Sequence, residues 1–201
     1  MTGKLTVFAL FAALFALANS GTAEACACCT NVGQRYVENT RLDSYRRDLI
    51  RELKFASDAT LYIGEGDADE IKGIASPSDR YTLAVTQQKD RFVFTFRDGK
   101  KNEGTLTLVI LDAIAVFEVD TRDAAFKDQG LGPVLYKEWR LTAPFSGTGI
   151  FTAGNGGYQR ITLIFQGRGR GCTDASHFGH WTISVHGPLG NYLLFGALEK
   201  K

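Results

Sequence analysis

Large hydrophobic residues recur at every second position along several short segments of this chain, and this pattern most constrains the fold. In residues 91–97, Phe92, Phe94 and Phe96 alternate with arginine, valine and threonine. Successive side chains of a β-strand point to opposite faces of a sheet, so the three phenylalanines would share one face. The segment is therefore predicted to be a strand with one buried face.

The same period of two recurs to the end of the chain, with turn sequences between the segments. A polar, glycine-containing stretch at 97–104 separates the first strand from a return strand at 105–111. Further strands are predicted at 135–142, 149–152, 158–166, 181–186 and 192–198. The predicted strands are separated by short turns, as in hairpins, and no long helical segment lies between them. This favours antiparallel pairing and excludes a fold of alternating helices and parallel strands.

We therefore predict an all-β protein, an antiparallel barrel of roughly eight to ten strands, with a β-sandwich as the alternative. The barrel is favoured because short turns join successive strands and closure removes exposed sheet edges. A barrel of about eight strands either holds one small ligand or is filled by its own side chains. The architecture resembles lipocalin barrels only at this coarse level, because the first tryptophan is Trp139 and no Gly-x-Trp motif precedes it.

One segment ahead of these strands has a helical period instead. In residues 40–55, apolar side chains spaced three to four apart predict a short amphipathic helix. The end of this segment, Leu53-Lys54-Phe55, is also compatible with the start of a strand. The predicted organisation is a signal peptide at 1–25, a cysteine-rich segment with a short helix at 26–56, and a β-barrel domain at 57–201.

The chain begins with the three parts of a secretory signal peptide. Lys4 precedes an apolar run from Leu5 to Leu17, and Ala23-Glu24-Ala25 supplies the small residues of a cleavage site. The apolar run is too short to span a bilayer. We expect cleavage after Ala25 and a secreted or periplasmic protein whose mature form does not contact the membrane. The glutamate at position 24 argues against lipid attachment to Cys26.

The overall charge argues against two classes of partner. The chain has 23 basic and 22 acidic residues, a formal net charge of +1. A near-neutral protein has no global positive field, so charge gives no support to binding of nucleic acid or of an anionic membrane surface.

Three of the four cysteines, Cys26, Cys28 and Cys29, lie within four positions, and Cys172 lies far from them. An oxidising compartment favours disulfides, and four cysteines allow three complete pairings. A bridge between Cys28 and Cys29 would be strained, so we expect one of the first three cysteines to bond to Cys172. Closing so long a loop contributes about 5 kcal/mol in the chain-entropy account.

The same three cysteines, with His177 and His180, are candidate ligands for copper or zinc. Three thiolates within four residues suit a soft metal ion, and a turn at Gly179 would let the two histidines share one. His186 lies about 20 Å along the strand from His180, too far to share an ion with it. Disulfides are favoured for the cysteines, with a redox-active dithiol as a further alternative, and an ordinary polar strand face is favoured for the histidines.

Residues 167–171, Gly-Arg-Gly-Arg-Gly, are predicted to form a flexible basic loop. Arg168 and Arg170, with the exposed amides between them, suit an anion or a sugar sulfate, and a solvated loop tip is the favoured alternative. On the strand predicted at 135–142, Glu138 and Arg140 alternate to the same face. We therefore expect Arg140 to neutralise Glu138.

No linear motif of a hydrolase, zinc protease or phosphate-binding loop is present in the sequence. The favoured function is an exported, disulfide-bonded protein that binds a small apolar ligand or a metal. The alternatives are an isomerase or cyclase with its site at the mouth of the barrel, and a filled barrel that acts through its surface. Convergent charged groups inside the fold would favour catalysis, and an apolar interior would favour packing or a carrier.

Overall fold

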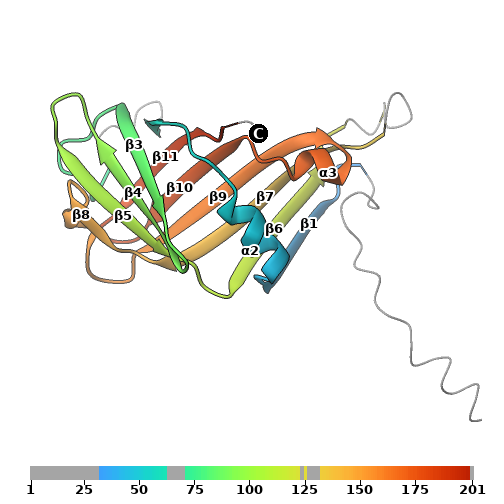
Figure 1. The fold of residues 1–201 in the computed structure, drawn as a ribbon, viewed down its shortest axis with the longest axis horizontal. Coiled ribbons are helices and arrows are strands. Elements are labelled where there is room, and N and C mark those ends of the chain that lie inside the picture. The colour runs from blue at the N-terminus through green and yellow to red at the C-terminus, as the bar shows by residue number, and fades with distance from the viewer. Residues whose placement is uncertain (1–31, 63–70, 123–124, 126–131, 200–201) are drawn as a thin grey trace, which may run out of the picture.

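The computed structural model describes residues 32–62, 71–122, 125 and 132–199 (Figure 1). In these ranges the chain forms one antiparallel sheet of eleven strands, with two α-helices and a short 3-10 helix. The strands are β1 (Arg35–Arg41), β2 (Asp58–Tyr62), β3 (Arg80–Gln87), β4 (Arg91–Arg97), β5 (Glu103–Val109), β6 (Ala113–Asp120), β7 (Val134–Pro144), β8 (Gly147–Gly149), β9 (Arg160–Arg170), β10 (His180–His186) and β11 (Asn191–Ala197). The helices are α2 (Ser44–Arg51), η4 (Thr152–Gly154) and α3 (Gly171–Ala175).

The strands lie in the order β1-β6-β7-β9-β10-β11-β2-β3-β4-β5-β8, and each neighbouring pair is antiparallel. The all-β antiparallel prediction is therefore confirmed. The predicted closure into a barrel is not observed, because β1 and β8 form the two edges of the sheet and do not pair with each other. The predicted signal peptide and its cleavage site fall outside the described residues.

The sheet curls strongly, and the chain between β7 and β8 requires this. β7 lies near one edge of the sheet and β8 at the other, yet only Phe145 and Ser146 separate them in the chain. The Phe145 N–H donates to the carbonyl of Gln159 (3.2 Å), and the Ser146 carbonyl accepts from the N–H of Thr107 on β5 (2.9 Å). The two parts of the sheet therefore face one another, with β3, β4 and β5 at an angle to β6, β7 and β9 (Figure 1).

An aromatic core fills the space between the two parts of the curled sheet. Phe92, Phe94 and Phe96 have no exposed surface, as their alternation predicts. The ring centroid of Phe94 lies 6.1 Å from that of Trp181 on β10 and 5.4 Å from that of Phe55. The face of the sheet that carries this core is called the inner face below, and the opposite face is the outer face.

Helix α2 covers part of the inner face, and Asp43 fixes its start. The Asp43 side chain accepts a hydrogen bond from the backbone N–H of Arg46 at 2.7 Å, which satisfies a donor at the helix end. Ile50 is buried in the core. The predicted helix is confirmed but is shorter than 40–55, because residues 40 and 41 belong to β1 and Phe55 forms a β-bridge with Leu198.

The predicted flexible loop at residues 167–171 is wrong. Residues 167–170 are the end of β9 and pair with β7, and Gly171 begins α3. A Cβ atom on Gly167 would lie 2.1 Å from the carbonyl oxygen of Ala175, and one on Gly169 would lie 2.3 Å from Cβ of Asp174. These two glycines are therefore needed for the close approach of α3 to the strand.

Within the described ranges, neither helix has the length and apolar content to cross a membrane.

Candidate functional site

A groove of about 1140 Å³ opens on the inner side of the sheet. It lies between the end of α2 with the residues after it, the end of β3, and the turn between α3 and β10. Its apolar lining consists of Leu49, Leu53, Phe55, Val85 and Phe178, all packed against the core. Most of its polar lining is exposed and forms the rim: Arg51, Glu52, Lys54, Gln87, Ser176, His177 and Glu199.

Hydrogen bonds connect α2 and the residues after it to the end of β3, to the turn that follows β3, and to Glu199. The Gln87 side-chain amide on β3 donates to the carbonyl of Ile50 (3.3 Å), and the Arg51 guanidinium donates to the carbonyl of Lys89 (3.3 Å). At the far end of the chain, the Glu199 N–H donates to the Lys54 carbonyl (2.9 Å). The groove is therefore formed by elements that are fixed to one another.

The turn between α3 and β10 is held in a similar way. The Ser176 hydroxyl donates to the carbonyl of Cys172 (2.9 Å), and the Gly179 N–H donates to the carbonyl of Gln166 on β9 (3.0 Å). Phe178 is carried inward by this turn and packs on Phe165, with ring centroids 6.0 Å apart.

The floor of the groove contacts both tryptophans of the chain. The ring centroid of Phe178 lies 4.9 Å from that of Trp139, and the centroid of Phe55 lies 5.9 Å from that of Trp181. Both indoles are buried, and neither indole N–H has a hydrogen-bond partner in the described structure. A molecule that enters the groove would therefore perturb both tryptophans through the phenylalanines.

The two histidines predicted as metal ligands lie in different surroundings. His177 lines the groove, whereas His180 begins β10 and alternates to the outer face with Thr182. Trp181, on the opposite face of β10, is buried, as its position in the alternation predicts. Among the described residues, no three histidine, cysteine or acidic side chains are grouped so as to hold a metal ion. Cys26, Cys28 and Cys29, predicted as disulfide or metal cysteines, lie outside those residues.

Cys172 lies in α3 and packs, as Tyr36 does, against the small buried cluster of Leu135 and Ala175. It is assigned as a disulfide-bonded cysteine. No complete disulfide lies within the described ranges, since they contain no second cysteine. The pairing of Cys172 with one of the three N-terminal cysteines stays a prediction.

A chain of hydrogen bonds surrounds Glu138 on the outer face of β7. Tyr136 donates its hydroxyl to one carboxylate oxygen of Glu138 (2.5 Å), and Nε of Arg140 donates to the other (2.6 Å). Arg140 therefore neutralises Glu138, as predicted. The Gln166 amide on β9 donates to the Tyr136 oxygen (2.9 Å), and the Thr182 hydroxyl on β10 donates to Gln166 (3.0 Å).

Burial and the hydrogen bond to Glu138 raise the pKa of Tyr136 to about 12. The hydroxyl is therefore protonated at neutral pH and acts as a donor. The ring of Phe117 supports the network, since its centroid lies 6.2 Å from that of Tyr136 and 5.6 Å from the guanidinium carbon of Arg140. We interpret this network as a connection between β7, β9 and β10, because its polar groups satisfy one another.

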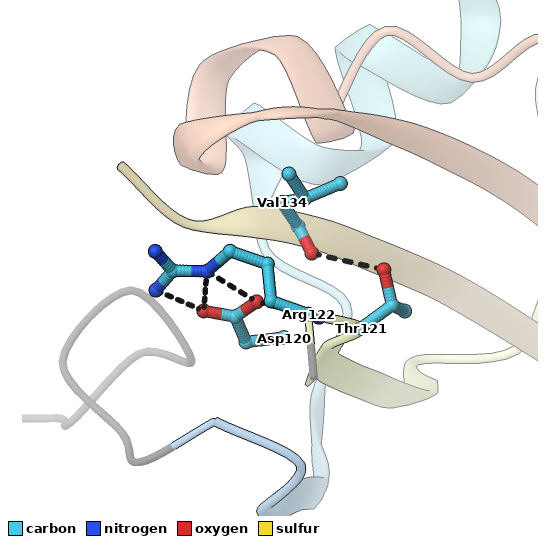
Figure 2. A network of polar contacts seen from close by, with 4 residues as sticks. All are labelled: Asp120, Thr121, Arg122 and Val134. Atoms are coloured by element: carbon cyan, nitrogen blue, oxygen red, sulfur yellow. Dashed lines mark hydrogen bonds and ion pairs between the residues drawn. The ribbon is translucent and has the colours of Figure 1, made fainter. Parts of the chain in front are cut away.

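A second polar network lies where β6 ends (Figure 2). The Arg122 guanidinium donates to both carboxylate oxygens of Asp120, with Nε 3.1 Å from each and Nη2 2.8 Å from Oδ2. Next to this pair, the Thr121 hydroxyl donates to the carbonyl of Val134 (3.3 Å). Asp120 is buried, and its hydrogen bonds to Arg122 lower the pKa of its carboxyl below the ordinary value.

The lowered pKa of Asp120 makes stability depend on pH. The contribution of the ionised Asp120 carboxylate to the free energy of unfolding is complete above the unfolded-state pKa of about 3.9. It is lost as the pH falls through the lower pKa of the folded state. We expect Asp120→Asn to reduce the free energy of unfolding at pH 7 by about 2 kcal/mol, because Arg122 loses a charged partner. The loss of stability below about pH 4 should also become shallower.

Urea unfolding at a series of pH values from 2 to 7 tests this expectation. Asp58→Asn is the control, because Asp58 is exposed and forms no ion pair in the described structure. An acid dependence of stability in Asp120→Asn equal to that of the unmodified protein would contradict the interpretation.

Comparison with known proteins provides no relative: no family model, curated protein or solved structure matches the chain.

The groove itself was not predicted from the sequence. Its lining comes from four separate parts of the chain, at 49–55, 85–87, 176–179 and 199. No part carries a recognisable motif, so the local sequence contained no signal that these residues would meet.

Proposed function

We propose that this protein is an exported binding protein whose groove takes a small ligand with an apolar body and a polar or charged end. The observation that carries the proposal is the combination of an apolar floor and a charged rim in one concavity of about 1140 Å³. Small-molecule sites are typically concave and mostly apolar, with a few polar groups that orient the ligand.

The floor supplies the expected driving force for binding. Leu53 and Phe55 are only partly buried although they pack against the core, so they still have surface for a ligand to cover. Covering apolar surface is worth about 25 cal/mol per Å². An alkyl chain or ring of a ligand that contacts these side chains would therefore be held mainly by the hydrophobic effect.

The rim supplies groups for the polar end of the ligand. Lys54, His177 and Glu199 are exposed there, and none forms an ion pair within the described structure. Both signs of charge are present, so the rim can accept an anionic, a cationic or a neutral polar group. We propose binding rather than catalysis, since no described side chain hydrogen-bonds the His177 ring to orient it as a base.

Export and the disulfide are part of the same proposal. Residues 1–25 have the sequence of a signal peptide, and the predicted bond from Cys172 to an N-terminal cysteine would form outside the cytoplasm. Such a bond would hold α3, and with it the groove turn at 176–179, to the start of the mature chain.

Three probes with the same alkyl chain test the groove: octanoate and octylammonium below their micellar concentrations, and octanol below its solubility limit. Only two tryptophans are present and both contact the floor, so intrinsic fluorescence reports on ligand entry. We expect a saturable change with at least one probe. Leu53→Gln should weaken binding about tenfold, because it removes apolar contact area.

Leu189→Gln is the matched control, since Leu189 is an exposed leucine that does not line the groove. Lys54→Ala should weaken octanoate binding more than octanol binding and leave the unfolding temperature unchanged. The proposal is overturned by a failure of all three probes to give a saturable change. It is also overturned if Leu53→Gln, shown to be folded by its unfolding curve, binds as tightly as Leu189→Gln.

A further inference from the structure

We propose that the outer face of the sheet, at the end formed by β1, β6, β7 and β9, binds an acidic polysaccharide through Arg35, Arg168 and Arg170. These residues are called the arginine face. The arginine face lies on the opposite side of the sheet from the groove, so this proposal does not depend on the groove being a ligand site.

The strand register places the three arginines on one surface. Arg35 pairs with Val119, Val119 with Tyr136, and Tyr136 with Arg168, in one row across four adjacent strands. Paired residues share a face, and Tyr136 belongs to the outer-face network described above. With about 4.8 Å between strands, Arg35 and Arg168 lie about 14 Å apart, and Arg170 follows about 7 Å along β9.

The three arginines are exposed and form no ion pair, which sets them apart from most arginines of the described chain. Eight others each pair with an aspartate or a glutamate. Within the described part of the chain, the one hydrogen bond of the Arg168 guanidinium is a long one, 3.5 Å, to the Thr121 hydroxyl. Glu138 is the one carboxylate among the outer-face residues of these four strands, and it already forms an ion pair with Arg140.

Protection of a sheet edge gives only part of the reason for this arrangement. A charge on an edge strand can serve to prevent unwanted pairing, which would explain Arg35 on β1. At Arg168 and Arg170, β9 pairs with β7 alone, because its pairing with β10 stops at Gln166, so these arginines also lie at an edge. Such protection requires no particular sign of charge, and it does not account for three arginines on one face without a described carboxylate to pair with them.

The spacing of the arginines suits an extended polyanion. Each guanidinium offers a planar pair of donors that fits a carboxylate or a sulfate, and three guanidiniums spread over this distance can contact successive charged groups of one chain. The Thr121 hydroxyl lies next to Arg168 and suits a hydroxyl of a sugar chain.

Two other polyanionic partners, an anionic membrane and a single-stranded nucleic acid, fit the arginine face less well. Among the larger apolar side chains near the arginines, only Val37 is strongly exposed, whereas binding into a membrane needs a broad apolar surface. Single-stranded nucleic acid binds on exposed aromatic rings, but Phe117 and Tyr136 are partly buried here. An acidic polysaccharide needs neither, and the predicted export would bring the protein into contact with such chains.

Dextran sulfate tests the proposal, with uncharged dextran as the reference. Using the full mature chain in isothermal titration calorimetry, we expect binding of dextran sulfate that weakens as sodium chloride rises, and no binding of dextran. Combined replacement of Arg35, Arg168 and Arg170 by alanine should weaken binding at least tenfold. Arg168→Lys should also weaken it, because a lysine keeps the charge but lacks the forked donors.

Arg160→Ala is the matched control. Arg160 is an exposed, unpaired arginine on the outer face of the same strand, about 33 Å from Arg170. The proposal is overturned if the triple variant binds dextran sulfate as tightly as Arg160→Ala. It is equally overturned if DNA or phosphatidylglycerol vesicles bind the arginine face more tightly than dextran sulfate does. Octanoate, octylammonium and octanol binding should be the same in the triple variant, which separates this face from the groove.

Discussion

Replacing Phe94 by alanine is expected to lower the free energy of unfolding by about 4 kcal/mol. Phe94 has no exposed surface, and its ring centroid lies 5.4 Å from that of Phe55, 6.4 Å from that of Phe96 and 6.1 Å from that of Trp181. These neighbours come from both parts of the curled sheet. Removing the ring leaves a cavity that neither part can close without moving against the other.

Phe195→Ala is the control for this substitution, because Phe195 lies on the outer face with 40% of its surface exposed. Its loss should lower the free energy of unfolding by less than about 1 kcal/mol. Urea denaturation of both variants gives the comparison. Equal losses, or a loss below about 1 kcal/mol for Phe94→Ala, would contradict a core enclosed between the two parts of the sheet.

Gly167→Ala is expected to lower the free energy of unfolding by about 3 kcal/mol, a large effect for one added methyl group. The new Cβ atom would lie 2.1 Å from the carbonyl oxygen of Ala175, so α3 would have to move away from β9. The turn at 176–179 follows α3 directly and lines the groove. Binding of octanoate, octylammonium and octanol in the groove should therefore also be weaker in this variant.

Gly99→Ala is the control, because nothing lies within 4 Å of a Cβ at Gly99 and its φ angle is not positive. Chemical denaturation should show little change in this variant. A Gly167→Ala protein as stable as Gly99→Ala would mean that α3 does not rest on β9 as described.

The strands and their buried faces could be predicted because the alternation of apolar and polar residues can be recognised within each segment by itself. Phe92, Phe94 and Phe96, which were expected to share a buried face, have no exposed surface. The same holds for Ile161, Leu163 and Phe165, which alternate along the strand predicted at 158–166. The open sheet could not be predicted in this way, since closure depends on which strands lie at the edges. β1 pairs with β6, about 75 residues away in the chain, and its sequence carries no clear alternation.

The error at residues 167–171 has a related cause. Glycines in a polar segment are typical of loops, but here they make room for a helix that packs on the strand. Only the tertiary contact with Ala175 and Asp174 distinguishes the two cases. Arg168 and Arg170 remain candidate anion-binding residues, but they lie on a regular strand, with Arg35 three strands away on the same face, rather than on a flexible loop.

The interpretation of the histidines shows the same limit of local reasoning. Alternation correctly placed His180 on the polar face of its strand. His177 lines the groove because the turn after α3 brings it next to the end of α2, which lies more than a hundred residues earlier in the chain.

The most direct test of the ligand site is the set of backbone amides that shift when octanoate is added, measured by two-dimensional nitrogen–proton NMR. The account predicts that the largest shifts fall at residues 49–55, 85–87 and 176–179, with the indole signals of Trp139 and Trp181 moving at the same concentrations. Shifts confined to the outer face, or none at saturating octanoate, would contradict it.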